Sequence, residues 1–165
     1  MGMGIHSVFL VSKSTGSLVY SRYFDSEELL SCESKESFES NLFLHTRQYW
    51  SSLDVPGVDR FCICLDGTLV VLVLIVGDLL IYTNGTNEMD EATLPEPAEA
   101  LRDVVIELVG VIHGMRDTGK INEGHIVESN DLYAKLALSV DEMFPLGVIE
   151  HLDTKTTLRL IKLKE

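Results

Sequence analysis

The sequence has 165 residues, a length that fits one domain with a hydrophobic core of its own. It carries 13 Lys and Arg against 26 Asp and Glu, and the formal charge of −13 would repel both a nucleic-acid backbone and an anionic bilayer. The composition therefore argues against nucleic acid as a partner and predicts that any membrane contact is indirect.

Cysteine usage and hydropathy indicate the compartment. Cys32, Cys62 and Cys64 cannot all pair within one chain, and the first residues lack the basic-then-apolar shape of a signal peptide. The longest apolar stretch, residues 69–82, is shorter than the ~18 to 20 residues needed to cross a bilayer. We therefore expect a cytoplasmic protein without a membrane span.

The first predicted elements are a β-hairpin and a helix. Residues 5–11 are β-rich, residues 12–16 form a polar turn, and residues 17–24 form the returning strand. A helix is expected from about residue 34 to 52, with Ser34 as its N-cap. Its buried side is expected to carry Phe38, Leu42, His45, Tyr49, Phe43 and Trp50.

The centre of the chain predicts a three-stranded meander. Apolar residues 61–65, 69–76 and 79–82 are separated by the turn dipeptides Asp66-Gly67 and Gly77-Asp78. The middle strand is apolar at every position, so we expect it to be covered on both faces.

The remainder of the chain is predicted to be mostly helical. Residues 84–99 are acidic and contain two prolines, which indicates an exposed, mobile loop. A helix follows from Pro97 to a stop at Gly114, residues 115–129 are ambiguous, and Asn130 is expected to cap a helix that ends at Pro145 and Gly147. The last helix is expected over about residues 153–164. The order of elements predicts a single α+β domain over residues 1–165, with one antiparallel sheet and helices on its faces.

No pattern of catalytic or metal-binding residues emerges. Cys62 and Cys64 share a strand face, but a metal site needs about four ligands and no second pair completes one. His113 has no nucleophile in a recognisable context, so a position at a helix C-terminus, where the dipole favours it, is the simpler role. The glycines do not form a phosphate-binding loop. We expect no catalytic, cofactor or metal site.

Three motifs resemble the small chains of vesicle-coat adaptors. Residues 16–25, GSLVYSRYFD, look like the second strand of the zeta subunit of coatomer, and residues 38–43, FESNLF, are similar to the start of that family's first helix. Residues 140–144, VDEMF, with Gly147, Ile149 and Glu150, resemble the end of the third helix in zeta chains and sigma adaptins. Together the motifs span residues 5 to about 162 in the right order.

The resemblance implies a longin-like (SNARE-like) fold, with a five-stranded antiparallel sheet flanked by helices. It also implies a non-catalytic subunit that binds the trunk of a large adaptin-like chain, beside a medium chain, in a heterotetrameric coat. Such a coat is recruited peripherally to membranes in vesicle-mediated protein transport or endocytosis. The acidic stretch 84–99 departs from the coatomer and sigma patterns, so the small chain of the plant TPLATE or TSET-type complex ranks at least level with coatomer zeta.

The partner interface is expected on the helix after Pro97 and on the turn after residue 140. The helix's apolar stripe is wider than one sheet face should absorb, so part of it is free for a partner. The expected interface residues are Leu101, Val104, Leu108, Val109, Val111, Val140, Asp141, Glu142, Met143 and Phe144. Binding of acidic dileucine signals, as in sigma adaptins, is not expected because the matching segment contains Glu123 and Glu128. The alternative functions are a longin-like regulator of small GTPases or tethering complexes and, further behind, an enzyme.

Overall fold

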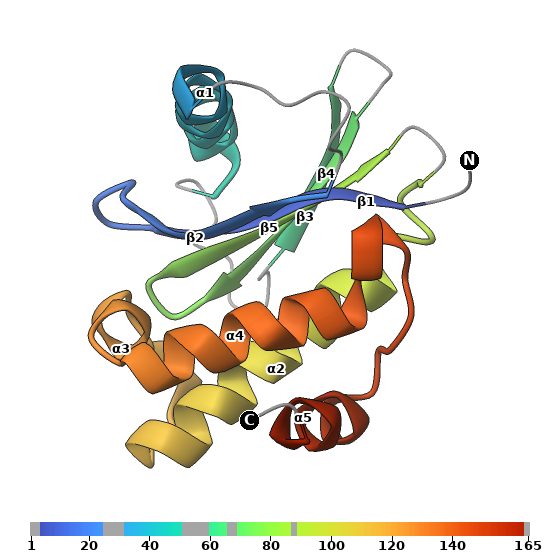
Figure 1. Ribbon diagram of the computed structural model, residues 1–165. Helices are drawn as coiled ribbons and strands as arrows, with labels where there is room; N and C mark the ends of the chain where they lie inside the picture. Colours follow the sequence, from blue (N-terminus) through green and yellow to red (C-terminus); the bar gives the residue numbers. More distant parts are fainter. Residues whose placement is uncertain (1–3, 25–31, 51–59, 66–68, 87–88, 164–165) are drawn as a thin grey trace.

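The computed structural model describes residues 4–24, 32–50, 60–65, 69–86 and 89–163, as drawn in Figure 1. Its strands are β1 (Ile5–Ser12), β2 (Leu18–Tyr23), β3 (Arg60–Leu65), β4 (Leu69–Val76) and β5 (Leu79–Thr86). Its α-helices are α1 (Cys32–Trp50), α2 (Pro95–His113), α3 (Gly124–Val127), α4 (Asn130–Met143) and α5 (Thr154–Lys162). Two short 3-10 turns, η1 (Thr118–Lys120) and η2 (Pro145–Gly147), complete the described elements.

The five strands form one antiparallel sheet in the order β2-β1-β5-β4-β3. The predicted hairpin and meander are both confirmed, and β1 joins them by pairing with β5. Gly77 turns β4 into β5 with a φ of 58°, a conformation that glycine adopts without steric cost. The expected Asp66-Gly67 turn lies outside the described residues.

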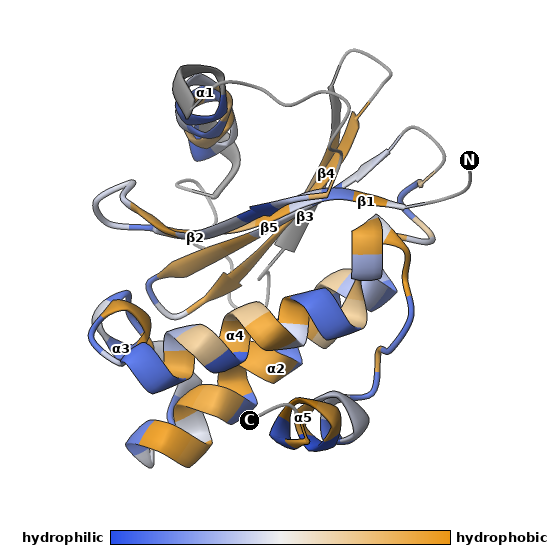
Figure 2. Cartoon of the chain, viewed as in Figure 1, coloured by the Kyte–Doolittle hydropathy of each residue, from blue (hydrophilic) through white to orange (hydrophobic). Residues whose placement is uncertain are grey.

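Both faces of the central strands are buried, as the uninterrupted apolar sequence of β4 predicts. Val70, Leu72 and Leu74 belong to the larger core, on the side of α2 and α4, whereas Val71 and Val73 belong to a smaller core beneath α1. Figure 1 shows α1 on one side of the sheet and α2, α4 and α5 on the other. Figure 2 shows that the central strands are largely hydrophobic, whereas α4 and α5 carry both kinds of residue around their circumference.

Three local expectations are corrected by the structure. The stretch 84–99 is not one exposed loop, because its first residues complete β5, α2 begins at Pro95, and Met89 and Leu94 are buried between them. In α4 the N-cap is Ser129 rather than Asn130, since the Ser129 hydroxyl accepts a hydrogen bond of 3.1 Å from the Leu132 amide.

The third correction concerns α1. Among the α1 side chains that the structure describes, those of residues 35–47, His45 is exposed and Glu39, Leu42 and Thr46 are buried. The prediction is confirmed at Leu42, and Phe38 and Phe43 are partly buried against the smaller core. The side chains of Tyr49 and Trp50 lie outside the described residues. Helix α1 also begins two residues earlier than the expected Ser34.

Candidate partner-binding surface

The structure places seven of the ten predicted interface residues inside the core of this chain. These residues are at most 4% exposed and pack between α2, α4 and the sheet: Leu101, Val104, Leu108, Val109, Val140, Met143 and Phe144. The helix and the turn were located correctly, but most of their apolar side chains are occupied by packing within the chain. Val111, Asp141 and Glu142 are the predicted residues that reach the surface.

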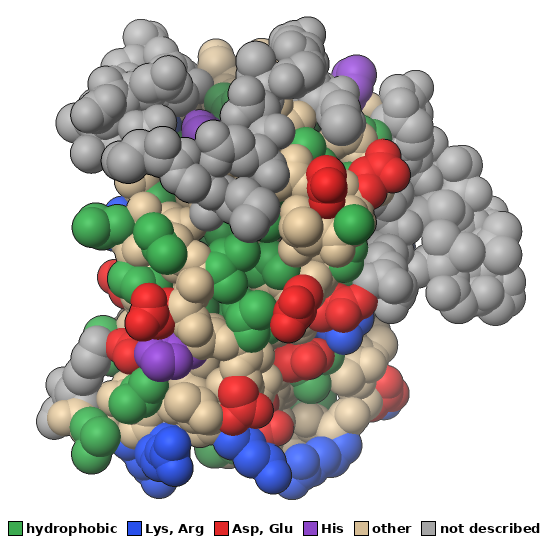
Figure 3. Space-filling view, turned by 90° about the vertical axis from the view of Figure 1, so that its right-hand side faces the viewer, with side chains coloured by type: hydrophobic (Ala, Val, Ile, Leu, Met, Phe, Trp, Pro, Cys, Tyr) green, Lys and Arg blue, Asp and Glu red, His purple; other side chains and the backbone are tan. Residues whose placement is uncertain are grey.

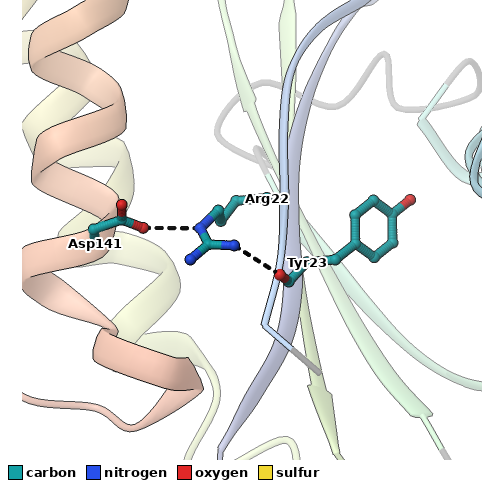
Figure 4. A network of polar contacts seen from close by, with 3 residues as sticks. All are labelled: Arg22, Tyr23 and Asp141. Carbon is teal, nitrogen blue, oxygen red and sulfur yellow. Dashed lines mark hydrogen bonds and ion pairs between the residues drawn. The ribbon is translucent and has the colours of Figure 1, made fainter. Parts of the chain in front are cut away.

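Asp141 makes a contact within the chain. Its Oδ1 accepts a hydrogen bond of 2.9 Å from Nε of Arg22, and Nη1 of the same guanidinium donates to the Tyr23 carbonyl at 3.0 Å (Figure 4). The guanidinium also lies 5.2 Å from the ring centroid of Phe24. Both members of the pair are about half exposed, so this contact between the C-terminal half of α4 and β2 contributes little stability.

Glu142 and Val111 lie in different surroundings. Glu142 is partly buried, with Oε1 3.7 Å from Nε2 of His151, so this contact becomes an ion pair only when the histidine is protonated. Val111, near the C-terminal end of α2, is 69% exposed. It is the one apolar member of the predicted interface that the described structure leaves open to solvent.

The turn after α4 holds an exposed leucine in a left-handed conformation. Leu146 has φ 54° and ψ 27°, which is uncommon for a residue with a side chain, and it is 86% exposed. The turn is closed by hydrogen bonds from the Gly147 amide to the Phe144 carbonyl, 2.9 Å, and from the Glu150 amide to the Met143 carbonyl, 2.8 Å. Phe144, just before this turn, is buried, whereas Leu146 and, two residues further along the chain, the half-exposed Val148 reach solvent.

A second apolar surface is a groove of about 400 Å³ between α2 and α5. Apolar side chains of both helices line it, namely Leu108, Val111, Ile112, Leu158 and Ile161. Its basic rim is formed by Lys135 of α4 and by Lys155, Arg159 and Lys162 of α5. Figure 3 shows Lys and Arg gathered along the edge of the molecule where α5 lies, with Asp and Glu predominating higher on the same face.

A hydrogen bond between two titratable side chains connects the sheet to α1. Tyr23 donates a hydrogen bond of 2.9 Å to Oε2 of Glu39, which joins β2 to α1. Burial raises the pKa of the Glu39 carboxyl, and the hydrogen bond from Tyr23 only partly opposes that shift. Burial, followed by the interaction with Glu39, raises the pKa of Tyr23.

The expected catalytic and metal candidates are also placed. His113 ends α2, and its Nε2 lies 2.6 Å from the carbonyl oxygen of His125. Cys62 is partly buried and packs against the larger core, while the side chains of Cys32 and Cys64 lie outside the described part of the chain. Within the described residues, no three His, Cys, Asp or Glu side chains group as metal ligands.

The exposed Leu146 and the groove between α2 and α5 were not predicted from the sequence, although each leaves a signal there. Leu146 stands between Pro145 and Gly147, in a turn where an apolar side chain has no helical face to bury. Lys155, Arg159 and Lys162 are spaced four and three residues apart, which places them on one side of a helix. The sequence alone does not show which other elements lie next to this turn or next to the basic side of this helix.

Comparisons with known proteins support the fold. No protein-family model matches the sequence, and no curated protein matches it. A chain in a structure described as a homology model of the full-length AP-3 complex in a stretched open conformation is similar, with a TM-score of 0.64 at 8% identity. The likeness covers 97% of this chain and 92% of that chain.

Two further structures show weaker likeness. The Roadblock/LC7 domain from Streptomyces avermitilis has a TM-score of 0.41 at 16% identity, and covers 61% of this chain and 84% of that domain. MglC from Myxococcus xanthus has a TM-score of 0.36 at 13% identity, over 50% of this chain and 68% of that one. At these TM-scores neither supports an inference about this chain.

The described helices include none that is both long and apolar enough to cross a membrane. The sheet order, the helices on its two faces and the whole-length likeness to a chain of the AP-3 complex agree with one another. The predicted α+β, longin-like fold is therefore confirmed, and at 8% identity the likeness extends to the fold alone.

Proposed function

We propose that this protein is a non-catalytic small subunit of a heterotetrameric adaptor complex of vesicle coats. The observation that carries the proposal is the fold likeness to a chain of the AP-3 complex, which extends over nearly the full length of both chains. The three adaptor-like sequence motifs support the same assignment independently, because they occur in the order that the fold requires.

In this proposal the protein binds the trunk of a large adaptin-like chain, beside a medium chain, and reaches membranes peripherally through the complex. The turn at Leu146 and Val148 is the proposed contact. A strained, exposed leucine is costly in an isolated chain, and burying it against a partner would recover hydrophobic free energy. Coatomer, a clathrin adaptor and a TPLATE-type complex are the specific complexes that this proposal includes.

The test is affinity purification of the full chain from its own cells, followed by identification of co-purifying chains by mass spectrometry. We expect a large adaptin-like chain and a medium chain. Leu146→Asp should reduce their recovery about tenfold or more, since burying a carboxylate at an apolar contact is unfavourable. Leu44→Asp is the matched control, because Leu44 is also exposed, at 62%, but lies on α1 across the sheet.

Two outcomes would contradict the assignment to a coat, and a third would contradict the proposed contact at the turn. A chain that remains monomeric in cell extract and recovers no adaptin-like partner would not be a coat subunit. Recovery of a nucleotide-bound small GTPase or of tethering subunits, without any large adaptin-like chain, would instead favour a regulatory longin-like protein. Equal loss of recovery with both aspartate variants would place the partner contact away from the turn.

A further inference from the structure

The groove between α2 and α5 combines an apolar lining with a basic rim in a protein that is otherwise acidic. Its α5 side arises from one amphipathic helix, in which Ile161 is 2% exposed whereas Lys155, Arg159 and Lys162 are exposed. Its α2 side includes the exposed Val111. From this arrangement we propose that the groove binds an acidic amphipathic helix of another protein, which inserts aliphatic side chains between α2 and α5. The inference does not depend on the proposed coat function.

The apolar lining specifies the inserted group. Val111, Ile112 and Leu158 present branched aliphatic side chains to a space of about 400 Å³, which is large enough for aliphatic side chains of a partner. A helix fits between two helices by placing side chains three or four residues apart into the groove. Burial of those side chains would supply the hydrophobic part of the binding free energy.

The basic residues at the rim of the groove indicate that the partner helix is negatively charged. Four of the 13 Lys and Arg residues surround this one groove, while the chain as a whole carries a formal charge of −13. Lys135 contacts Asp131 within its own helix at 3.4 Å. In contrast, no ion pair within 4 Å joins Lys155, Arg159 or Lys162 to a carboxylate of the described residues, although Lys155 and Arg159 lie near enough to Asp153 to help lower the pKa of its carboxyl. These three cations are therefore available to carboxylates on either side of an inserted aliphatic residue.

A peptide segment fits these features better than a membrane does. The groove is concave, so a single side chain can enter it, whereas a bilayer surface would meet only its rim. The large negative charge of the rest of the chain would also oppose approach to anionic lipids. Anionic vesicles are therefore the competing ligand in the test.

The experiment measures binding of the full chain to a fluorescein-labelled peptide of sequence EELEELEE by fluorescence anisotropy. We expect binding that weakens as salt is raised, because the rim charges are exposed to solvent. Versions with every Glu replaced by Gln, or with both Leu replaced by Ser, should each bind at least about tenfold more weakly, since they remove the charged and the apolar contacts respectively.

Two double variants separate the groove from the overall charge. Lys155→Glu with Arg159→Glu reverses the rim and should weaken binding about tenfold or more, since it replaces attraction by repulsion at two positions. Arg116→Glu with Lys120→Glu removes the same amount of positive charge at exposed positions outside the groove lining, and should change binding less than about twofold. Circular dichroism and thermal unfolding verify that both variants fold.

Three results would overturn the proposal. Equal loss of affinity in the two double variants would show a general charge effect, and undiminished binding of the Ser peptide would show that no aliphatic side chain is inserted. Binding of the chain to phosphatidylserine vesicles, lost in the rim variant and without binding of EELEELEE, would assign the groove to a lipid surface. Failure of this test leaves the purification of coat subunits unaffected, because that test reports on the turn at Leu146.

Discussion

Gly147 allows the turn after α4 to lie against β1. Its φ is 86°, and a Cβ at this position would lie 2.6 Å from the Ile5 carbonyl oxygen. We expect Gly147→Ala to lower the free energy of unfolding by about 2 to 5 kcal/mol, which combines the left-handed backbone cost with the cost of overpacking. Urea denaturation followed by circular dichroism measures this loss.

Gly114 is the matched control for that variant. It also has a left-handed φ, 67°, at the end of α2, but no heavy atom lies within 4 Å of the position its Cβ would take. Gly114→Ala should therefore cost only the backbone contribution, about 1 to 2 kcal/mol. If the two variants lose equal stability, the close approach of Gly147 to β1 has no energetic consequence.

Glu39 should make stability depend on pH. Burial raises the pKa of its carboxyl in the folded state, so the neutral form is favoured there relative to the unfolded chain. Its contribution is fully present below its ordinary pKa and is lost as the pH rises through its folded-state pKa. Glu39→Gln keeps an acceptor for Tyr23 but does not ionise, and should therefore gain stability relative to the wild type as the pH rises.

The measurement compares urea unfolding of both proteins between about pH 4 and 8. The difference in unfolding free energy, variant minus wild type, should increase with pH above the ordinary pKa of glutamate and then level off. Subtracting the two curves cancels the titration of the other acidic groups. A difference that stays constant with pH would mean that Glu39 has the same pKa in the folded and unfolded chain.

These residues also show why individual side chains were harder to place than elements. His45 is exposed, whereas Glu39 and Thr46 are buried between α1 and the sheet. Their burial is tolerated because Glu39 hydrogen-bonds to a residue of β2 and Thr46 to a residue of β5. Such partners come from strands distant in the sequence. The pattern within α1 alone therefore could not identify the polar residues of its buried face.

Helix α1 is attached to the sheet by a buried polar contact. The Thr46 hydroxyl lies 2.7 Å from the Tyr82 hydroxyl of β5, and Tyr82 itself stacks on Phe9 with ring centroids 4.6 Å apart. Tyr82→Phe should lower the free energy of unfolding by about 0.5 to 1.5 kcal/mol, the usual net value of one hydrogen bond, because the ring stacking is retained.

A double-mutant cycle isolates this contact. Thr46→Val removes the same hydroxyl pairing from the side of α1, along with the bond of 2.8 Å that Thr46 donates to the Leu42 carbonyl. The two losses should be less than additive in the double variant, by about 1 kcal/mol. Strict additivity would show that α1 is held by apolar packing without help from this pair.

At the level of helices and strands, the hydrophobic pattern and the turn residues correctly predicted features that depend on neighbouring residues in the sequence. The uninterrupted apolar run of β4 correctly implied cover on both faces, and Gly114 correctly ended α2. The acidic stretch 84–99 was misplaced because its polar residues concealed two anchors, Met89 and Leu94, that are buried against the larger core. Composition averages over a segment, whereas burial is decided by single residues.

The overall fold of the molecule could be predicted from the sequence better than its exposed surface. The order of strands and helices led to the longin-like fold, and the helices that carry or adjoin seven of the predicted interface residues lie where they were predicted. Those residues proved to be core, because the sequence does not show how much of α2 is covered by α4 and α5. The surfaces to which Leu146 and the basic residues of α5 belong became evident only when the packing of those helices was known.

The layered architecture predicts a gradient of local stability across the sheet. Strands β1, β5 and β4 have a strand on each side and side chains buried on both faces, whereas β2 and β3 form the edges. Amides of β5 should therefore exchange with deuterium most slowly, because exchange there requires opening of the sheet and of both helical layers. Amides of β2 should exchange faster, although Arg22 connects this edge to Asp141 of α4.

Hydrogen–deuterium exchange followed by mass spectrometry of peptides checks this order. Asp141→Asn removes the charge from the contact with Arg22 and should accelerate exchange in β2 without changing exchange in β5, since the half-exposed pair contributes only about 0 to 1 kcal/mol. Equal acceleration in both strands would show that the sheet opens as one unit. Protection greatest in α2 or α4, rather than in β5, would mean that the helical layer and not the shared sheet is the most stable part of the fold.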